Sequence, residues 1–335
     1  MVLNNTSTNM NVDQNTQKTN WKQKLYVLFD KGSTTIGLAL LFIIMSIITT
    51  DFLTVDNLLN VMRQSAVLCI MAVAMTFIII TGGIDLSAGS QLAVSGVVVS
   101  GLIVAGVPIP LAILITVLVG GLIGLFMGTV ISTQNIPPFI VTLAMTTILS
   151  GIAFVYTAGT PVVITDAGFR QIGRGYLGPI PTAIIIMIVV AVIGHILLSH
   201  TRFGRNVYAI GDNEEAARLC GINVKWVKTG VYVLGGAVTA IAGIVLASRL
   251  SSGSPNAGTG SELDAIAAVV LGGTNLFGGE GKIAGTLMGV AIISILNNGL
   301  NLLNVSSYNQ LMIKGVVILL AVWLNSIKAR KNASV

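Results

Sequence analysis

The residues best placed to act on a partner lie in one charged stretch, GDNEEAARLCGINV, at positions 211–224. Only 9% of the 335 residues are charged, so two adjacent glutamates and an arginine are unusual here. Asp212 can serve as the N-cap of a short helix, with Glu215 three positions later in a capping-box-like arrangement. Gly221 suits the left-handed position that ends a helix. We therefore predict about two turns of helix, too short to be stable alone in water.

This short helix must pack against another surface. One alternative is the inner surface of the protein itself, and the other is a groove on a cytoplasmic partner. In the second case, Leu219 and Ile222 would be the apolar anchors. Glu214 and Arg218 would make the polar contacts. A short helix tied to two membrane spans could then transmit the motion of the partner into the bundle.

Residues that could form a catalytic or metal centre are scarce. Cys69 and Cys220 form no C-x-x-C pair, so we expect neither a disulfide framework nor a metal site. His195 and His200 are the only histidines and have no cluster of partners, which disfavours a polytopic membrane enzyme. The nearest approach to a phosphate loop, GGEGKIAG at 278–285, lacks the first glycine and the Ser or Thr of that motif. We expect no cofactor, and any ATP must be bound by another chain.

The composition indicates a polytopic helical membrane protein. Hydrophobic residues make up 54% of the chain and charged residues only 9%. A soluble domain of this size would carry about 25% charged residues. The 38 glycines fit this class, because small residues let membrane helices approach closely. The stretch GGLIGLFMG places Gly120, Gly124 and Gly128 four residues apart, which predicts a close-approach seam.

The fold class we predict is all-α, with about ten transmembrane helices. Three apolar runs, 36–50, 66–81 and 263–275, are short, and they must borrow flanking residues, tilt, or remain partly buried against neighbouring helices. The weakest is Leu263 to Asn275. The runs are 36–50, 66–81, 88–107, 109–131, 137–158, 179–198, 229–247, 263–275, 283–304 and 308–327.

The basic residues orient these runs. With the N-terminus inside, 13 of the 18 Lys and Arg residues fall in cytoplasmic segments, which predicts that both termini are cytoplasmic. Contact with anionic headgroups then suffices to explain the net charge of +6, and no nucleic acid is needed. The outer segments hold Arg63, Arg170, Arg174 and Arg249. The predicted parts are a polar cytoplasmic tail at 1–35, a membrane domain at 36–327 with a cytoplasmic coupling loop at about 199–228, and a cytoplasmic tail at 328–335.

Charged residues inside the runs are too few for an evident ion relay. Lys314 lies well inside a run, where it either extends to an interface along its own stem or pairs with a buried acid such as Asp264. This scarcity weakens a stand-alone secondary carrier for a small polar solute, which we keep as the alternative function.

Polar side chains in the runs are candidates for a solute path. The stretch NNGLNLLN places Asn297, Asn301 and Asn304 at i, i+4 and i+7, on one helical face. They would line a hydrated path, or else only hydrogen-bond between helices. Further candidates for the path are Gln91, Ser95, Thr142, Thr146 and Thr147.

Two glycine-rich loops resemble one another, TGGIDLSAGS at 81–90 and LGGTNLFGGE at 271–280. An internal duplication and a chance likeness of glycine-rich loops both explain this. Asp85 is suited to cap the helix that follows the first loop.

A family resemblance adds to these inferences. The segment EAARLCG at 215–221 matches the E-A-A-x-x-x-G coupling-helix signature of ABC importer permeases. Together with GIDLSAGS, RFGRNVYAIGDNEEAARLCGINV, ELDAIAAVVLGGTNLFGGEGKIAGTLMG and NNGLNLLNVSSYNQLMIKGVVILLAV, it resembles the ribose-type monosaccharide permeases of that superfamily. The resemblance covers roughly residues 36–327, and paralogues for galactose, xylose, arabinose or a signalling furanose share much of it.

The resemblance implies a transport subunit, not an enzyme, in the bacterial cytoplasmic (inner) membrane. Its partners would be a cytoplasmic ABC ATPase, an external sugar-binding protein (periplasmic or lipid-anchored), a second copy of itself and membrane lipids. ATP binding would draw two ATPase domains together and move two coupling helices. The residues that would couple to the ATPase are Asp212, Glu214, Glu215, Ala216, Ala217, Arg218, Leu219, Gly221 and Ile222.

Overall fold

The computed structural model describes the backbone of residues 21–333, and side chains between residues 34 and 323 apart from positions 318 and 321. This part of the chain is helical, with two pairs of two-residue strands, so the predicted all-α class is confirmed. The helices are α1 Trp21–Ile48, α2 Val55–Ile80, α3 Ala88–Val104, α4 Ile109–Gln134, α5 Pro138–Thr157, α6 Ala167–Arg174, α7 Thr182–His200, α8 Arg202–Asp212, α9 Glu214–Leu219, α10 Val224–Leu250, α11 Ser261–Leu271, α12 Ile283–Leu302 and α13 Ser307–Ala333.

Each of the ten predicted apolar runs overlaps a helix, but not every one of these helices is long enough to cross a membrane. Among the described residues, six helices have the length and apolar character of a span: α2, α4, α5, α7, α10 and α12. Thr34–Ile48 and α3 are apolar but shorter. The 11 residues of α11 rise only about 16 Å, against a hydrocarbon core of about 30 Å. The count of ten spans and the side on which the termini lie stay predictions.

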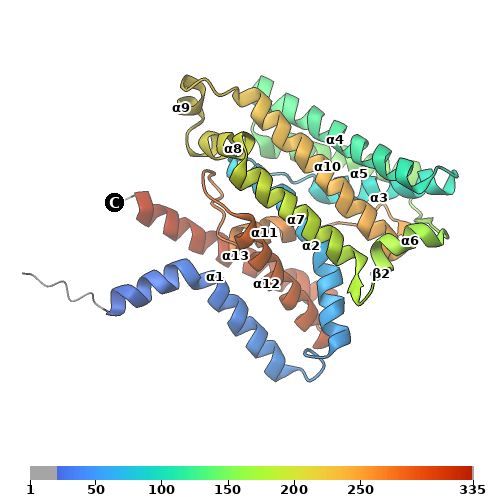
Figure 1. Cartoon of the computed structure of the whole chain (residues 1–335), viewed down its shortest axis with the longest axis horizontal. Helices are drawn as coiled ribbons and strands as arrows, with labels where there is room; N and C mark the ends of the chain where they lie inside the picture. The colour runs from blue at the N-terminus through green and yellow to red at the C-terminus, as the bar shows by residue number, and fades with distance from the viewer. Residues whose placement is uncertain (1–20, 334–335) are drawn as a thin grey trace, which may run out of the picture.

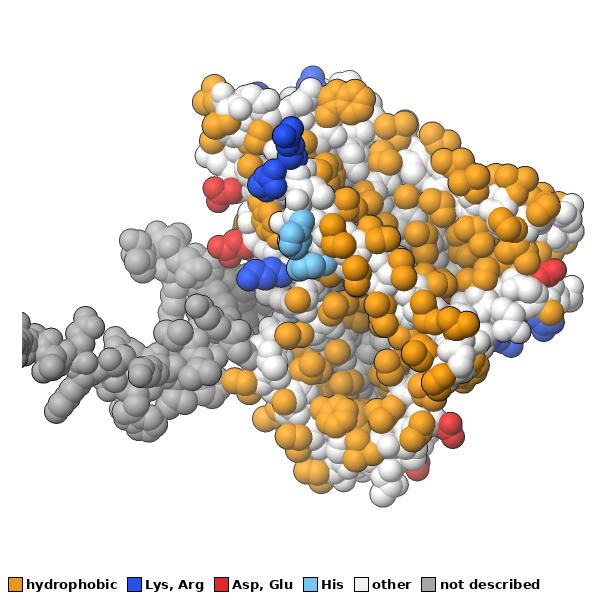
Figure 2. All heavy atoms as spheres, in the orientation of Figure 1, with side chains coloured by type: hydrophobic (Ala, Val, Ile, Leu, Met, Phe, Trp, Pro, Cys, Tyr) orange, Lys and Arg blue, Asp and Glu red, His pale blue; other side chains and the backbone are white. Residues whose placement is uncertain are grey.

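Helices α2 and α10 form the centre of the bundle (Figure 1). In the most apolar stretch of each helix, 78% of the stretch is buried in α2 and 61% in α10, but only 22% in α4. Apolar side chains of the outer helices face outward instead, and Figure 2 shows them spread over one face of the molecule. This distribution is the one that a lipid environment favours.

The predicted glycine seam joins α4 to α10. A Cβ atom at Gly120 would lie 2.5 Å from the carbonyl oxygen of Gly236, and one at Gly128 would lie 2.8 Å from Cα of Thr229. Gly124 likewise lies against the backbone of Tyr232. The two helix backbones therefore touch at three points over a little more than two turns, which confirms the seam.

The end of the molecule opposite α9 carries small elements that the sequence patterns did not predict (Figure 1). Strand β1 (Val162–Val163) pairs with β4 (Ser252–Gly253), and β2 (Tyr176–Leu177) pairs with β3 (Ile180–Pro181). Between them, α6 packs on the last turns of α10, where the Ser248 hydroxyl accepts a hydrogen bond from the amide of Gly173 at 2.7 Å.

Candidate functional site

The predicted coupling loop holds two helices, not one. Helix α8 begins after Thr201, whose hydroxyl accepts a hydrogen bond from the amide of Gly204 at 3.1 Å. Helix α9 follows, and its N-cap is Asn213, whose side-chain oxygen accepts from the amide of Ala216 at 2.9 Å. The prediction of Asp212 as the cap was therefore wrong, because Asp212 is the last residue of α8 and the extended backbone needed for a cap falls one residue later.

Helix α9 ends as the sequence predicted. Gly221 has a φ of +84°, in the left-handed region that glycine adopts readily. The amide of Ile222 donates to the Ala217 carbonyl at 3.1 Å, and that of Gly221 donates to the Arg218 carbonyl at 3.0 Å. This is the Schellman arrangement, which satisfies the last carbonyls of a helix.

One carboxylate fixes α9 to the start of α10. Glu214 pairs with Arg218 at 3.1 Å within α9, and with Lys228 of α10 at 2.5 Å. The Lys228 side chain is 19% exposed and that of Glu214 is 39% exposed, so water screens the pair only in part. Part of α9 thus does dock on the protein itself.

The other face of α9 remains uncovered. Leu219, a predicted anchor, is 85% exposed. Ile222, the second predicted anchor, packs instead against the buried core, because the helix-ending turn directs it inward. Trp226, at 74% exposed, is an apolar surface residue near α9 that the sequence interpretation missed. Its position between Lys225 and Lys228 was the available signal.

The remaining predicted coupling residues differ in exposure. Glu215, Ala216 and Arg218 are exposed, whereas Ala217 is 4% exposed and faces inward. The free thiol of Cys220 is exposed as well. The exposed residues share the surface with Leu219, so α9 presents one mixed polar and apolar face.

Both glycine-rich loops meet beneath α8 and α9. The amide of Gly279 donates to the carbonyl of Ile80 at 3.0 Å, and the Tyr208 hydroxyl of α8 donates to the carbonyl of Gly281 at 2.6 Å. A Cβ atom at Gly278 would lie 2.8 Å from the carbonyl oxygen of Gly211. The loops that precede α3 and α12 are therefore held directly against α8.

The two loops are not conformationally equivalent. In the first loop only Gly82, the first glycine of its pair, has a positive φ, whereas in the second loop Gly273, the second of its pair, and also Gly278 and Gly279 have one. This difference lends no support to an internal duplication. Between the loops, α9 and α10, a cavity of about 290 Å³ is lined by Gly82, Glu214 and Lys228, among others.

The predicted asparagine stripe is only partly present. Asn297 and Asn301 lie on α12, but Asn304 follows the end of that helix and has a φ of +54°. Its placement on the same helical face was wrong, because Asn tolerates the left-handed conformation and here terminates the helix. The Asn301 side-chain oxygen accepts from Gln310 at 2.9 Å. The Asn297 side-chain oxygen is buried without a hydrogen-bond partner in the described structure.

A neighbouring asparagine makes the stronger contact. Asn298 and Asn57 exchange two side-chain hydrogen bonds, at 2.8 and 3.0 Å, and so join α12 to the first turn of α2. The sequence interpretation missed Asn298, although its adjacency to Asn297 was visible. This pair shows that the face of α12 that carries Asn298 serves helix packing.

Of the other path candidates, Gln91 is distinctive. It is fully buried on α3, and neither its amide nitrogen nor its amide oxygen has a hydrogen-bond partner in the described structure. The Ser95 hydroxyl donates to the Gln91 carbonyl at 2.8 Å, and that of Thr146 donates to the Leu86 carbonyl at 2.8 Å. The hydroxyls of Ser95 and Thr146 are therefore satisfied by backbone.

The structure also shows the partners of two charged residues, Lys314 and Asp85. Lys314 pairs with Asp264 at 2.8 Å, joining α13 to α11, so the pairing alternative is the correct one. Asp85 accepts from the amide and the hydroxyl of Ser87 at 2.8 and 2.6 Å. It stabilises the turn before α3 instead of capping the helix, since the N-cap position is Ser87.

Comparison with known proteins gives consistent results. The chain is 51% identical to the ribose import permease protein of Bacillus subtilis (strain 168), over 88% of this chain and 92% of that protein. It is 46% identical to the ribose import permease protein of Escherichia coli (strain K12), over 88% and 92%. A xylose transport system permease protein of the same strain is 36% identical, over 85% and 88%. No solved structure matches the chain.

A family model described as "Branched-chain amino acid transport system / permease component" matches residues 57–322. That interval contains all six helices long and apolar enough to cross a membrane, except for the first two residues of α2. The chain therefore belongs to this family of membrane permeases.

Proposed function

We propose that the chain is the membrane-spanning subunit of an ABC importer in the bacterial cytoplasmic membrane, and that it moves ribose inward. Identity is higher to the two ribose import permeases, at 51% and 46%, than to the xylose permease, at 36%, over similar shares of the chain. Two copies would work with a separate ATPase and an external sugar-binding protein. ATP hydrolysis would then take place on the partner chain.

The observation that carries this proposal is the surface of α9. Leu219 is 85% exposed on a helix of six residues. Burial of this apolar side chain against another surface would lower its free energy. The same helix is fixed from behind by the pair of Glu214 with Lys228. An anchored helix with an uncovered apolar contact is suited to receive a partner, and we assign the ATPase to it.

We infer that motion of α9 reaches the bundle by two routes. The first runs through Glu214 and Lys228 into α10, whose glycine seam ties it to α4. The second runs through α8 into the two glycine-rich loops, where the Tyr208 hydroxyl holds the carbonyl of Gly281. Because those loops precede α3 and α12, a displacement of α8 would shift helices that carry the polar path candidates.

We further propose that Gln91 and Asn297 meet the solute during transport. A buried amide group without a partner costs free energy, and both residues have such atoms. Hydroxyl groups of a sugar both donate and accept hydrogen bonds, so they can pair with an amide oxygen or nitrogen as they pass.

The proposal is tested by uptake in vesicles that contain this chain, its ATPase and its binding protein. Ribose uptake should exceed that of xylose, galactose and arabinose, and should require ATP. The variant Leu219→Glu should lose uptake while its unfolding midpoint stays unchanged. Leu177→Glu is the matched control, because Leu177 is 70% exposed on β2, away from α9.

Two results would overturn the proposal. Uptake by this chain without an ATPase, following a proton or sodium gradient, would identify a stand-alone carrier. Normal uptake by Leu219→Glu would remove the coupling role from α9.

A further inference from the structure

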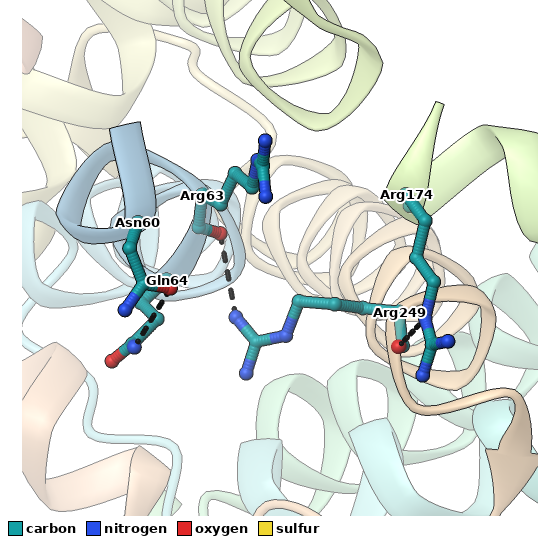
Figure 3. A pocket seen from close by; sticks show the side chains of 6 residues that line it. Asn60, Arg63, Gln64, Arg174 and Arg249 are labelled. Atoms are coloured by element: carbon teal, nitrogen blue, oxygen red, sulfur yellow. Dashed lines mark hydrogen bonds between the residues drawn. The ribbon is translucent and has the colours of Figure 1, made fainter. Parts of the chain in front are cut away.

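A second cavity lies at the end of the bundle opposite α9, where α2, α6 and α10 converge (Figure 3). Its volume is about 340 Å³. Helix α2 contributes Asn60, Arg63 and Gln64, the end of α6 contributes Gly173 and Arg174, and the end of α10 contributes Arg249. Three of these six residues are arginines, in a chain in which only 9% of the residues are charged.

None of the three arginines has a carboxylate within ion-pair distance among the residues that the structure describes. Arg249 donates to the backbone carbonyl of Arg63 at 3.4 Å, and Arg174 donates to that of Arg249 at 2.5 Å. The Arg63 guanidinium stacks on the ring of Tyr176 at 4.7 Å. Its Nε atom is buried and has no hydrogen-bond partner in the described structure.

Most of the donor capacity of the three groups is therefore unused. A guanidinium has five N–H donors, and each group here makes at most one hydrogen bond with a described partner. Figure 3 shows the Arg249 side chain reaching from the end of α10 toward α2, so that its guanidinium lies between the two helices. The three positive charges around this cavity are uncompensated among the described residues, and an anion within it would lower their electrostatic energy.

The cavity lies at one end of the two helices that form the centre of the bundle. The first turns of α2 and the end of α10 form two of its three walls, and the buried stretch of α2 begins only at Ala66. Arg249 is partly buried, so water screens its charge less than at an open surface. A compensating anion would therefore enter from the exposed side of the cavity and meet Arg63 and Arg249, the two arginines that are partly buried.

We propose that this cavity binds a small oxyanion, a carboxylate or a phosphate. The planar fork of arginine matches two oxygens of such a group and forms short, charge-assisted hydrogen bonds. The amide groups of Asn60 and Gln64 lie at the rim as additional donors. A bound oxyanion would join α2, α6 and α10 and stabilise their present arrangement. The proposal does not depend on the identity of the transported solute.

The test uses the full chain purified in dodecyl maltoside, a detergent without phosphate. Inorganic phosphate and then acetate replace chloride at constant ionic strength, and binding is followed by calorimetry and by the thermal unfolding midpoint. Wild type should bind phosphate saturably and unfold at a higher temperature. Arg249→Gln should weaken binding at least tenfold.

Arg170→Gln is the matched control. It removes an arginine from α6 that donates to the Thr165 carbonyl at 2.8 Å and does not line the cavity, so binding should be unchanged. If Arg249→Gln does not fold, Arg174→Gln serves instead, because Arg174 is exposed. Absence of saturable binding in wild type, or equal affinity in the cavity variant and Arg170→Gln, would overturn the proposal.

Discussion

The glycine seam between α4 and α10 makes a sharp quantitative prediction for Gly120→Ala. The added Cβ would lie 2.5 Å from the Gly236 carbonyl oxygen and 2.7 Å from Cβ of Ala240. Ordinary contacts begin near 3.4 Å, so the two backbones must separate by about 1 Å. A gap of that size forfeits roughly a quarter to a half of the dispersion energy of each affected contact. Overpacking of this kind costs about 1–3 kcal/mol.

The adjacent glycine supplies the control. A Cβ atom at Gly121 would have its nearest neighbour, Cγ1 of Val233, at 4.0 Å. Both replacements gain the same helix propensity, up to about 1 kcal/mol, so this term cancels between them. Gly121→Ala should therefore match or exceed wild type in stability, while Gly120→Ala falls below Gly121→Ala by about 1–3 kcal/mol.

The assay is reversible unfolding in mixed micelles by increasing SDS, followed by far-ultraviolet circular dichroism. Helicity before the transition should be the same for wild type and for both variants, because α4 remains a helix. If Gly120→Ala proved as stable as Gly121→Ala, the close approach of α4 and α10 would not exist in the folded protein.

Three further predictions concern single polar groups. Lys314→Met leaves Asp264 unpaired and should lower the free energy of unfolding by an amount near the low end of about 3–5 kcal/mol. Adding Asp264→Leu should recover most of this loss in the same SDS titration, and no recovery would contradict the pairing. Tyr208→Phe should lower the free energy of unfolding by about 1 kcal/mol at pH 8, because it removes the hydrogen bond to the Gly281 carbonyl. Burial raises the pKa of Tyr208. The stability contributed by its protonated hydroxyl is therefore fully present below an unfolded pKa of about 10 and is lost as pH rises through the folded pKa. Wild type should lose more stability than the variant between pH 8 and pH 11, and equal losses would refute the effect. Gln91→Leu removes two unpaired polar atoms and should not lower the unfolding midpoint, yet it should reduce ribose uptake; unchanged uptake would assign Gln91 to packing.

Patterns set by local chemistry were predictable from the sequence. The seam at Gly120, Gly124 and Gly128 follows from spacing alone, because residues four apart share a helix face. The end of α9 at Gly221 was equally predictable, since few other residues accept its φ of +84°. Each of the ten apolar runs likewise became a helix.

Features that depend on register or on distant segments were not predictable. Asp212 and Asn213 are both good caps, and only the length of α8 decides between them. Asn304 continues the spacing of the stripe, yet the helix stops before it. The cavity at the end opposite α9 is lined by residues from positions 60 to 249, and no sequence periodicity brings such distant arginines together.

The two cysteines give the protein a natural position for a single label. Cys69 is buried in α2, whereas Cys220, directly after α9, is exposed. A maleimide dye or nitroxide should therefore attach at Cys220 alone, without any engineered substitution. In the proposed assembly of two copies, such probes would form one symmetric pair next to the two copies of α9. Their separation, followed through a cycle of ATP binding and release, would show directly how far α9 moves.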